Sequence, residues 1–242
     1  QREPAAIIAA IPVTRGGAPA QKLDLEGITN DGEGGFWLAS EGRTDRLIPH
    51  ALYRVDRSGE IVDEVPFPAE LLAAERRFGA EGVTRIGDTL WIAIQREWAD
   101  DPKGMVKLVA YNTSSGEWGA VHYPLETPAK GWIGLSEITL HGDFVYIVER
   151  DNQIGSDAAV KQLYRVPVAQ LEPAALGGEL PVVEKELVRD FIPDLAAHNG
   201  YIVDKVEGFA VDSEGVGFVV TDNDGTDDSS GETFFWSIGP VD

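Results

Sequence analysis

Acidic side chains recur at matched places along this chain. Four segments each begin with a glutamate, continue through a turn and a hydrophobic run, and end with a second acid. The leading glutamates are Glu26, Glu81, Glu137 and Glu207, and the closing acids are Glu41, Glu97, Glu149 and Asp222. Carboxylate oxygens are the ligands that Ca²⁺ prefers, and it binds about six to eight oxygens. If folding gathers these side chains, they would form a calcium site.

Other residues near these acids could take part in the same chemistry. Asp224 follows Asp222 in the run DNDGTDD and is a further candidate metal ligand, although the run lacks the glycine spacing of a helix-loop-helix calcium loop. We predict catalytic roles for the cations Arg150, Arg96 and Lys205, which can neutralise charge that develops on a substrate, and for the closing acid Glu149. Two alternatives need no metal. The three cations could neutralise the acids, or the leading glutamates could simply accept backbone N–H bonds from neighbouring repeats.

The spacing of the leading glutamates indicates the elements that position them. Successive glutamates are 55, 56 and 70 residues apart by subtraction of their numbers, and periods of roughly 40 to 50 residues or a little more are typical of propeller blades. Each repeat also contains further alternating apolar runs joined by Gly-containing turns. We therefore predict an all-β protein: a β-propeller of four-stranded antiparallel blades, about four in this chain. The predicted single domain spans residues 1–242, with repeats near 24–79, 80–134, 135–205 and 206–242.

A blade of this kind would explain why acids stand at both ends of a hydrophobic hairpin. The innermost strand lines the central channel, and the second strand returns antiparallel to it, so the start of the first and the end of the second lie together. The sequence therefore predicts a ring of carboxylates around the channel mouth. Like charges this close raise one another's pKa unless a cation neutralises them.

Composition excludes several classes of function. Asp and Glu number 41 against 20 Lys and Arg, and the formal charge of −21 argues against a nucleic-acid partner. No apolar run is long enough to insert into a membrane. The absence of cysteine, with four histidines in unrelated contexts, leaves too few nitrogen and sulfur ligands for zinc. The sequence also lacks the motifs of α/β-hydrolases, zincins and P-loop enzymes.

The segments DLEGIT, EGVT, LSEITL, ERDNQ, KVEG and TDNDG resemble the bacterial phytase-like family, also called "esterase-like activity of phytase". The resemblance runs from about Leu23 to Gly239. It implies a β-propeller exported to the periplasm or the cell surface, with a hydrolase activity on phosphoester or ester substrates. It also implies a further blade before the first repeat. Since the chain opens at Gln1 without Met, we expect an N-terminal segment to be missing and five or six blades in the intact protein. Alternatively, the stretch AAIIAAIPV would complete the last blade and close a smaller ring.

Three functions remain open at this point. The first is hydrolysis of phosphate esters, in which calcium on the rim glutamates would hold the phosphate of a small anionic substrate. The second is a calcium-dependent lactonase or carboxylic-ester hydrolase. The third is a non-catalytic propeller that binds a ligand or calcium for stability.

Overall fold

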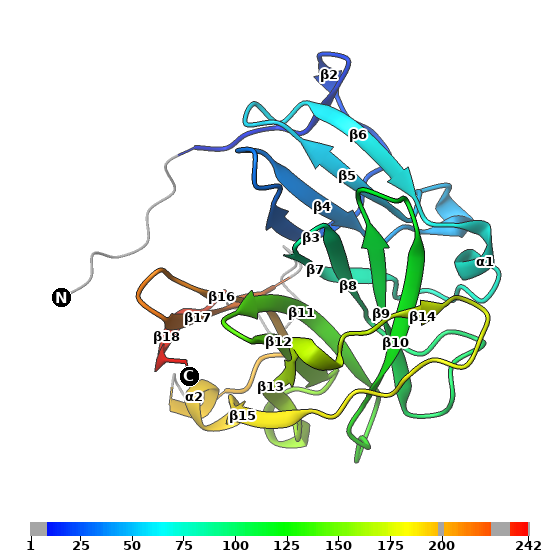
Figure 1. Ribbon diagram of the computed structural model, residues 1–242. Coiled ribbons are helices and arrows are strands. Elements are labelled where there is room, and N and C mark those ends of the chain that lie inside the picture. Colours follow the sequence, from blue (N-terminus) through cyan, green and yellow to red (C-terminus); the bar gives the residue numbers. More distant parts are fainter. Residues whose placement is uncertain (1–8, 198–200, 224–232, 242) are drawn as a thin grey trace.

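The computed structural model describes residues 9–197, 201–223 and 233–241. Four antiparallel sheets follow one another along the chain and are arranged as a four-bladed β-propeller, which confirms the predicted fold class (Figure 1). The helices α1 (Ala69–Leu72) and α2 (Ile192–Ala197) are short and lie in the connections. No helix of the described residues is long and apolar enough to cross a membrane.

Apart from β14, the strands are assigned to the four large sheets in chain order. The first sheet contains β3 (Leu25–Asn30), β4 (Phe36–Ser40), β5 (Ala51–Val55) and β6 (Ile61–Pro66). The second contains β7 (Ala80–Ile86), β8 (Thr89–Ile94), β9 (Met105–Asn112) and β10 (Trp118–Pro124), extended by β14 (Ala174–Ala175). The third contains β11 (Ile133–His141), β12 (Phe144–Asp151), β13 (Lys161–Pro167) and β15 (Glu186–Asp190). The fourth contains β16 (Lys205–Val211), β17 (Val216–Asp222) and β18 (Phe235–Pro240).

Hydrophobic side chains hold neighbouring sheets together. One cluster joins the first and second sheets through Leu52 and Ile92, a second joins the second and third through Leu108 and Ile147, and a third joins the third and fourth. The hairpin between β7 and β8 turns at Gly87, whose φ of 60° favours glycine. Burial of these faces fixes the sheets relative to one another and so fixes the place of their inner strands.

A β-bulge interrupts the inner strand of every sheet near its start. In β3 the register skips Glu26 between Leu25 and Gly27, and in β16 it skips Glu207. In β7 the irregularity falls between Ala80 and Val83, the interval that contains Glu81. In β11 the skipped residue is Ser136. A bulge leaves one residue outside the ladder and re-aims its side chain, so these four positions are equivalent.

The two ends of the described chain do not complete the fourth sheet. In the described residues that sheet has three strands, β16, β17 and β18. Of the segment expected to close the ring, residues 5–8 lie outside the described residues. Residues 9–13 form no strand, and Thr14 instead bridges Glu60 at the outer edge of the first sheet. A short hairpin of β1 (Thr14–Arg15) and β2 (Ala18–Pro19) follows there.

Candidate functional site

The ends of the first two strands of each sheet meet at a central cavity of about 200 Å³. The cavity, here called the acidic cavity, is lined mainly by charged side chains. Its lining residues are Glu26, Glu41, Arg77, Phe78, Glu81, Gln95, Trp132, Arg150, Asp204, Lys205, Glu207 and Asp222. The predicted convergence of acids from distant repeats is therefore present for Glu26, Glu41, Glu81, Glu207 and Asp222.

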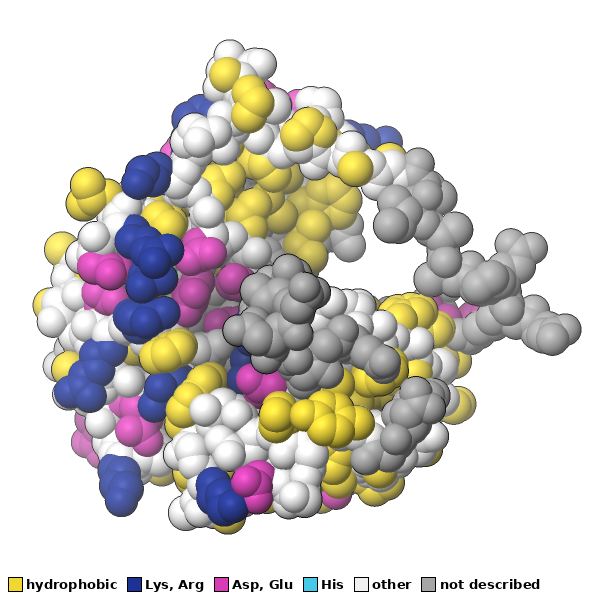
Figure 2. All heavy atoms as spheres, turned by 180° about the vertical axis from the view of Figure 1, so that it is seen from behind, with side chains coloured by type: hydrophobic (Ala, Val, Ile, Leu, Met, Phe, Trp, Pro, Cys, Tyr) yellow, Lys and Arg dark blue, Asp and Glu magenta, His cyan; other side chains and the backbone are white. Residues whose placement is uncertain are grey.

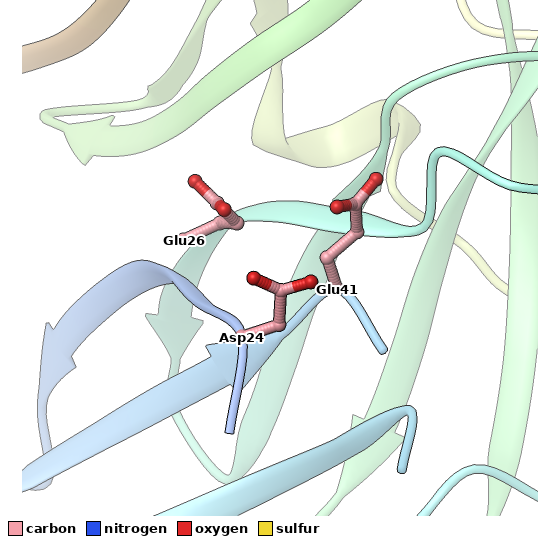
Figure 3. A group of neighbouring side chains, drawn as sticks. All are labelled: Asp24, Glu26 and Glu41. Carbon is pink, nitrogen blue, oxygen red and sulfur yellow. The ribbon is translucent and has the colours of Figure 1, made fainter. Parts of the chain in front are cut away.

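The first sheet contributes the densest group of acids. Asp24 precedes β3, Glu26 is the bulge residue of β3, and Glu41 follows β4. One carboxylate oxygen from each lies within 4.8 Å of the others, and the three side chains are neighbours (Figure 3). Backbone pairing sets this arrangement, because Glu41 N–H donates to the Asp24 carbonyl over 2.8 Å.

The second sheet adds a buried pair to the cavity. Glu81 is 5% exposed and Gln95 is 6% exposed, and Gln95 Nε2 donates to Glu81 Oε1 over 2.5 Å. The other amide atom, Gln95 Oε1, is buried without a hydrogen-bond partner in the described residues, as is Glu207 Oε2. A buried acceptor without a partner carries a desolvation cost. Both oxygens belong to cavity-lining residues, so a bound cation would satisfy them.

Arg150 from the end of β12 crosses between the sheets. It is 2% exposed; Nη2 donates to Glu207 Oε1 over 2.6 Å, and Nε donates to Ser136 Oγ over 3.2 Å. Burial opposes its charge, but the carboxylates of Glu207, Asp204 and Glu81 outweigh that and raise the pKa of Arg150. The guanidinium therefore stays charged and neutralises part of the ring of acids.

The crowded carboxylates hold protons more tightly than free ones. Desolvation, followed by the charges of Glu41, Asp24 and Glu207, raises the pKa of Glu26 to about 7. Desolvation and the same kind of repulsion, first from Glu207 and Glu26, raise the pKa of Glu81 well above its usual range. On the face drawn in Figure 2, basic and acidic side chains lie side by side. A divalent cation would lower these pKa values by replacing repulsion with attraction.

Glu137 occupies a strand position one residue later than the other leading glutamates. The register of β11 places it opposite Val148, the position held by Gly27 and Gly208 in their sheets. Its Oε1 accepts from Ile138 N–H over 2.9 Å, and it accepts a backbone hydrogen bond from Phe209 in β16. Glu137 does not line the acidic cavity. These contacts match the alternative in which a glutamate ties neighbouring repeats together.

The closing acids also divide between the cavity and other surroundings. Glu149 is fully buried away from it, where it accepts from Tyr123 Oη over 2.9 Å and pairs with Lys185 Nζ at 2.6 Å. Glu97 and Arg96 line a second, neighbouring pocket. Lys205 lines the acidic cavity, 4.0 Å from Asp222. Asp224 lies outside the described residues.

Sequence reasoning missed several polar residues in or beside the cavity: Arg77 and Asp204, which line it, and Asp24, Gln95 and Ser136. Asp24 stands two residues before Glu26, Gln95 takes the place that Glu41 and Asp222 hold in their sheets, and Ser136 takes the place of a leading glutamate. Counting outward from the bulge would have found Gln95 and Ser136. The repeat was defined by acidic residues alone, so an amide (Gln95) and a hydroxyl (Ser136) at the same positions were not included in it.

The donor set fits a hard cation better than a soft one. The acidic cavity offers carboxylate and amide oxygens, and its basic residues, Arg77, Arg150 and Lys205, cannot serve as ligands. Oxygen-rich sites suit Ca²⁺, Mg²⁺ or Mn²⁺. Asp24, Glu26 and Glu41, with the unpartnered oxygens of Gln95 and Glu207, are the residues that would hold such an ion.

The chain is similar to a known protein family. Residues 1–225 match the family described as "Phytase-like: Esterase-like activity of phytase". No curated protein matches the chain.

Proposed function

Because this chain belongs to the phytase-like family, whose description names an esterase-like activity, we propose that it is a metal-dependent hydrolase that cleaves phosphate esters at the acidic cavity. The observation that carries the proposal is the cavity itself, where six carboxylates from in or beside the strands of three sheets meet Arg150 and Lys205. Carboxylates alone would repel a phosphate. A cation held by them would attract it.

The residues of the cavity have separable roles in this proposal. Asp24, Glu26 and Glu41 would hold the cation, and a cation held there would supply Lewis acidity and lower the pKa of a bound water. Arg150 is fixed by Glu207 and Ser136, so its position costs no rearrangement when charge develops on the substrate. Lys205 lies more openly at the same cavity and can contact a substrate oxygen.

Carboxylic-ester or lactone hydrolysis is the second candidate, favoured by the esterase-like activity in the family's description. The same cation would polarise an ester carbonyl. We also propose that the protein works in the periplasm or outside the cell, as the resemblance implies. Fractionation of the source cells tests that location.

Metal binding is tested first by melting the protein after chelation and again after adding CaCl₂, MgCl₂ or MnCl₂. Wild type should melt higher with the preferred metal, because a ligand of the folded state stabilises by mass action. Glu26→Gln and Glu41→Gln should lose this shift. Glu184→Gln, which changes an exposed carboxylate away from the cavity, should keep it.

Activity is tested with phosphomonoesters, phosphodiesters and aryl esters on the same set of proteins. We expect metal-dependent release of phosphate that Glu26→Gln abolishes and Glu184→Gln retains. Ester cleavage without phosphoester cleavage would favour the second candidate. Rates equal to buffer on every substrate, with a clear metal-induced shift in melting, would leave a non-catalytic metal-stabilised propeller.

A further inference from the structure

A second pocket of about 430 Å³ adjoins the acidic cavity and differs from it in charge. The two share Arg77, Phe78 and Trp132 in their linings. The second pocket is also lined by Arg76, Arg96 and Lys103, and we call it the arginine pocket. It therefore brings together four cationic side chains in a chain whose formal charge is −21.

These cations lack the partners that cations in an acidic protein usually find. Within the described residues, Arg76, Arg77, Arg96 and Lys103 form no ion pair and no side-chain hydrogen bond. Other basic side chains do, as Lys107 shows with Asp100 and Asp101 at 2.6 and 2.5 Å.

The two carboxylates that line the arginine pocket are already engaged. Glu97 Oε1 accepts from Gly104 N–H over 2.5 Å. Glu126 Oε1 accepts from Tyr164 Oη over 3.0 Å and pairs with Lys185 Nζ at 3.1 Å. Glu97 offsets part of the charge of Arg96, and Glu41 offsets part of that of Arg77, but the lining still holds four cationic side chains against two carboxylates, one of which is paired with Lys185.

Aromatic rings hold one of the cations in place. The Arg96 guanidinium carbon lies 4.7 Å from the Phe78 ring centroid and 4.5 Å from that of Trp132. Stacking against two rings restricts the guanidinium while leaving its N–H groups without a protein acceptor. A planar fork of donors held this way suits an oxyanion, because guanidinium groups bind phosphate and carboxylate through paired hydrogen bonds.

We propose that the arginine pocket binds an oxyanion, and that this anion is a second charged group of the substrate cleaved in the acidic cavity. The second clause rests on the proposed function; the binding of an anion does not. The preferred substrates are then esters that carry a phosphate or carboxylate beyond the bond that is cleaved. The shared lining of Arg77, Phe78 and Trp132 makes the two pockets neighbours.

Equilibrium dialysis of metal-free protein against labelled pyrophosphate and labelled citrate tests the anion site without any need for activity. Wild type should bind at least one probe at low salt and bind it more weakly as NaCl is raised. Binding of pyrophosphate alone would identify phosphate as the ligand group, and binding of both would identify oxyanions in general. Arg96→Gln should weaken binding about tenfold, the effect expected for loss of one charge-assisted contact.

Because Arg96 also packs against aromatic rings, the double variant R76Q/K103Q provides a second test at exposed positions. It should weaken binding as well, whereas Arg46→Gln, the same charge change at an exposed arginine outside the pocket, should not. Circular dichroism verifies the fold of each variant. No binding by wild type, or equal binding by wild type and both pocket variants, would overturn the proposal.

Kinetics separate this proposal from the proposed function. Arg96→Gln should raise KM for a sugar bisphosphate several-fold more than KM for p-nitrophenyl phosphate. Equal effects on both substrates would overturn the assignment of the second anion to the substrate. If pyrophosphate binds as expected but no ester is cleaved, the proposed function and the substrate assignment fail while the anion site stands.

Discussion

Replacing Glu137 by Gln should change how stability depends on pH. Desolvation between β11 and its neighbouring sheets raises the pKa of Glu137 from 4.5 to about 8, and the charge of Glu207 adds to this. Below pH 4.5 the folded and unfolded states both hold the proton. Between pH 4.5 and 8 only the folded state holds it, so stability falls as pH rises, until above pH 8 both states are ionised and the loss is complete.

The size of the effect follows from the shift. Each pKa unit corresponds to about 1.4 kcal/mol, so a shift of this size sets an upper bound of about 4 to 5 kcal/mol between pH 4.5 and 9. Glutamine keeps an acceptor for the Ile138 N–H and carries no charge. The variant should therefore gain about 3 to 5 kcal/mol relative to wild type over this range, or about 10 °C in Tm for a chain of this size.

The assay is urea unfolding of metal-free wild type and Glu137→Gln at pH 5, 7 and 9. Comparing the two proteins at each pH removes the contributions of other groups. Glu26 and Glu81 contribute with the same sign, since their pKa values are raised, whereas burial lowers the pKa of His50 and destabilises the fold as pH falls. A difference between variant and wild type that stays within about 0.5 kcal/mol across the range would refute the reasoning.

Three further substitutions test other parts of the structure. Gly82→Ala should lower the free energy of unfolding by about 3 kcal/mol or more, because the new Cβ would lie 2.7 Å from the Glu137 Cα. The control is Gly178→Ala, whose Cβ would make only an ordinary contact and should change the melting temperature little. Arg150→Met should lower the free energy of unfolding by about 3 kcal/mol in urea, since it leaves Glu207, whose side chain is only 21% exposed, without its ion-pair partner; a loss below about 1 kcal/mol would contradict this. Glu149→Gln should lower Tm by breaking the ion pair with Lys185, yet it should leave the metal-induced shift in Tm unchanged. If the variant lost that shift, Glu149 would be a metal ligand after all.

The architecture was accessible from the sequence because it depends on local patterns. Alternating apolar residues and Gly-containing turns identify the hairpins, and near-constant spacing of the repeats identifies blades. The convergence of Glu26, Glu81 and Glu207 followed from that geometry alone. Residues that share a strand end in every repeat are brought together by the symmetry of the fold.

The exceptions depend on register and on distant partners, which a single sequence does not display. In β11 Ser136 holds the bulge position and Glu137 holds the next position, where β3 and β16 have glycine, so aligning Glu137 with the other leading glutamates hides a shift of one residue. Glu149 faces away from the cavity because it precedes Arg150 on β12 and successive strand residues point to opposite faces; there it pairs with Lys185, from the loop before β15. Neither the register shift in β11 nor the pairing of Glu149 with Lys185 can be read from local hydrophobic periodicity.

At the bulges of the four inner strands, the side chain can change without changing how the strands pair. A residue at a bulge makes no regular ladder pair, so changing its side chain leaves the strand alignment intact. Three sheets carry glutamate there and one carries serine, on the same backbone. Evolution can therefore revise ligand identity and local charge one sheet at a time, and Ser136→Glu would be the smallest step toward a different ion or substrate preference.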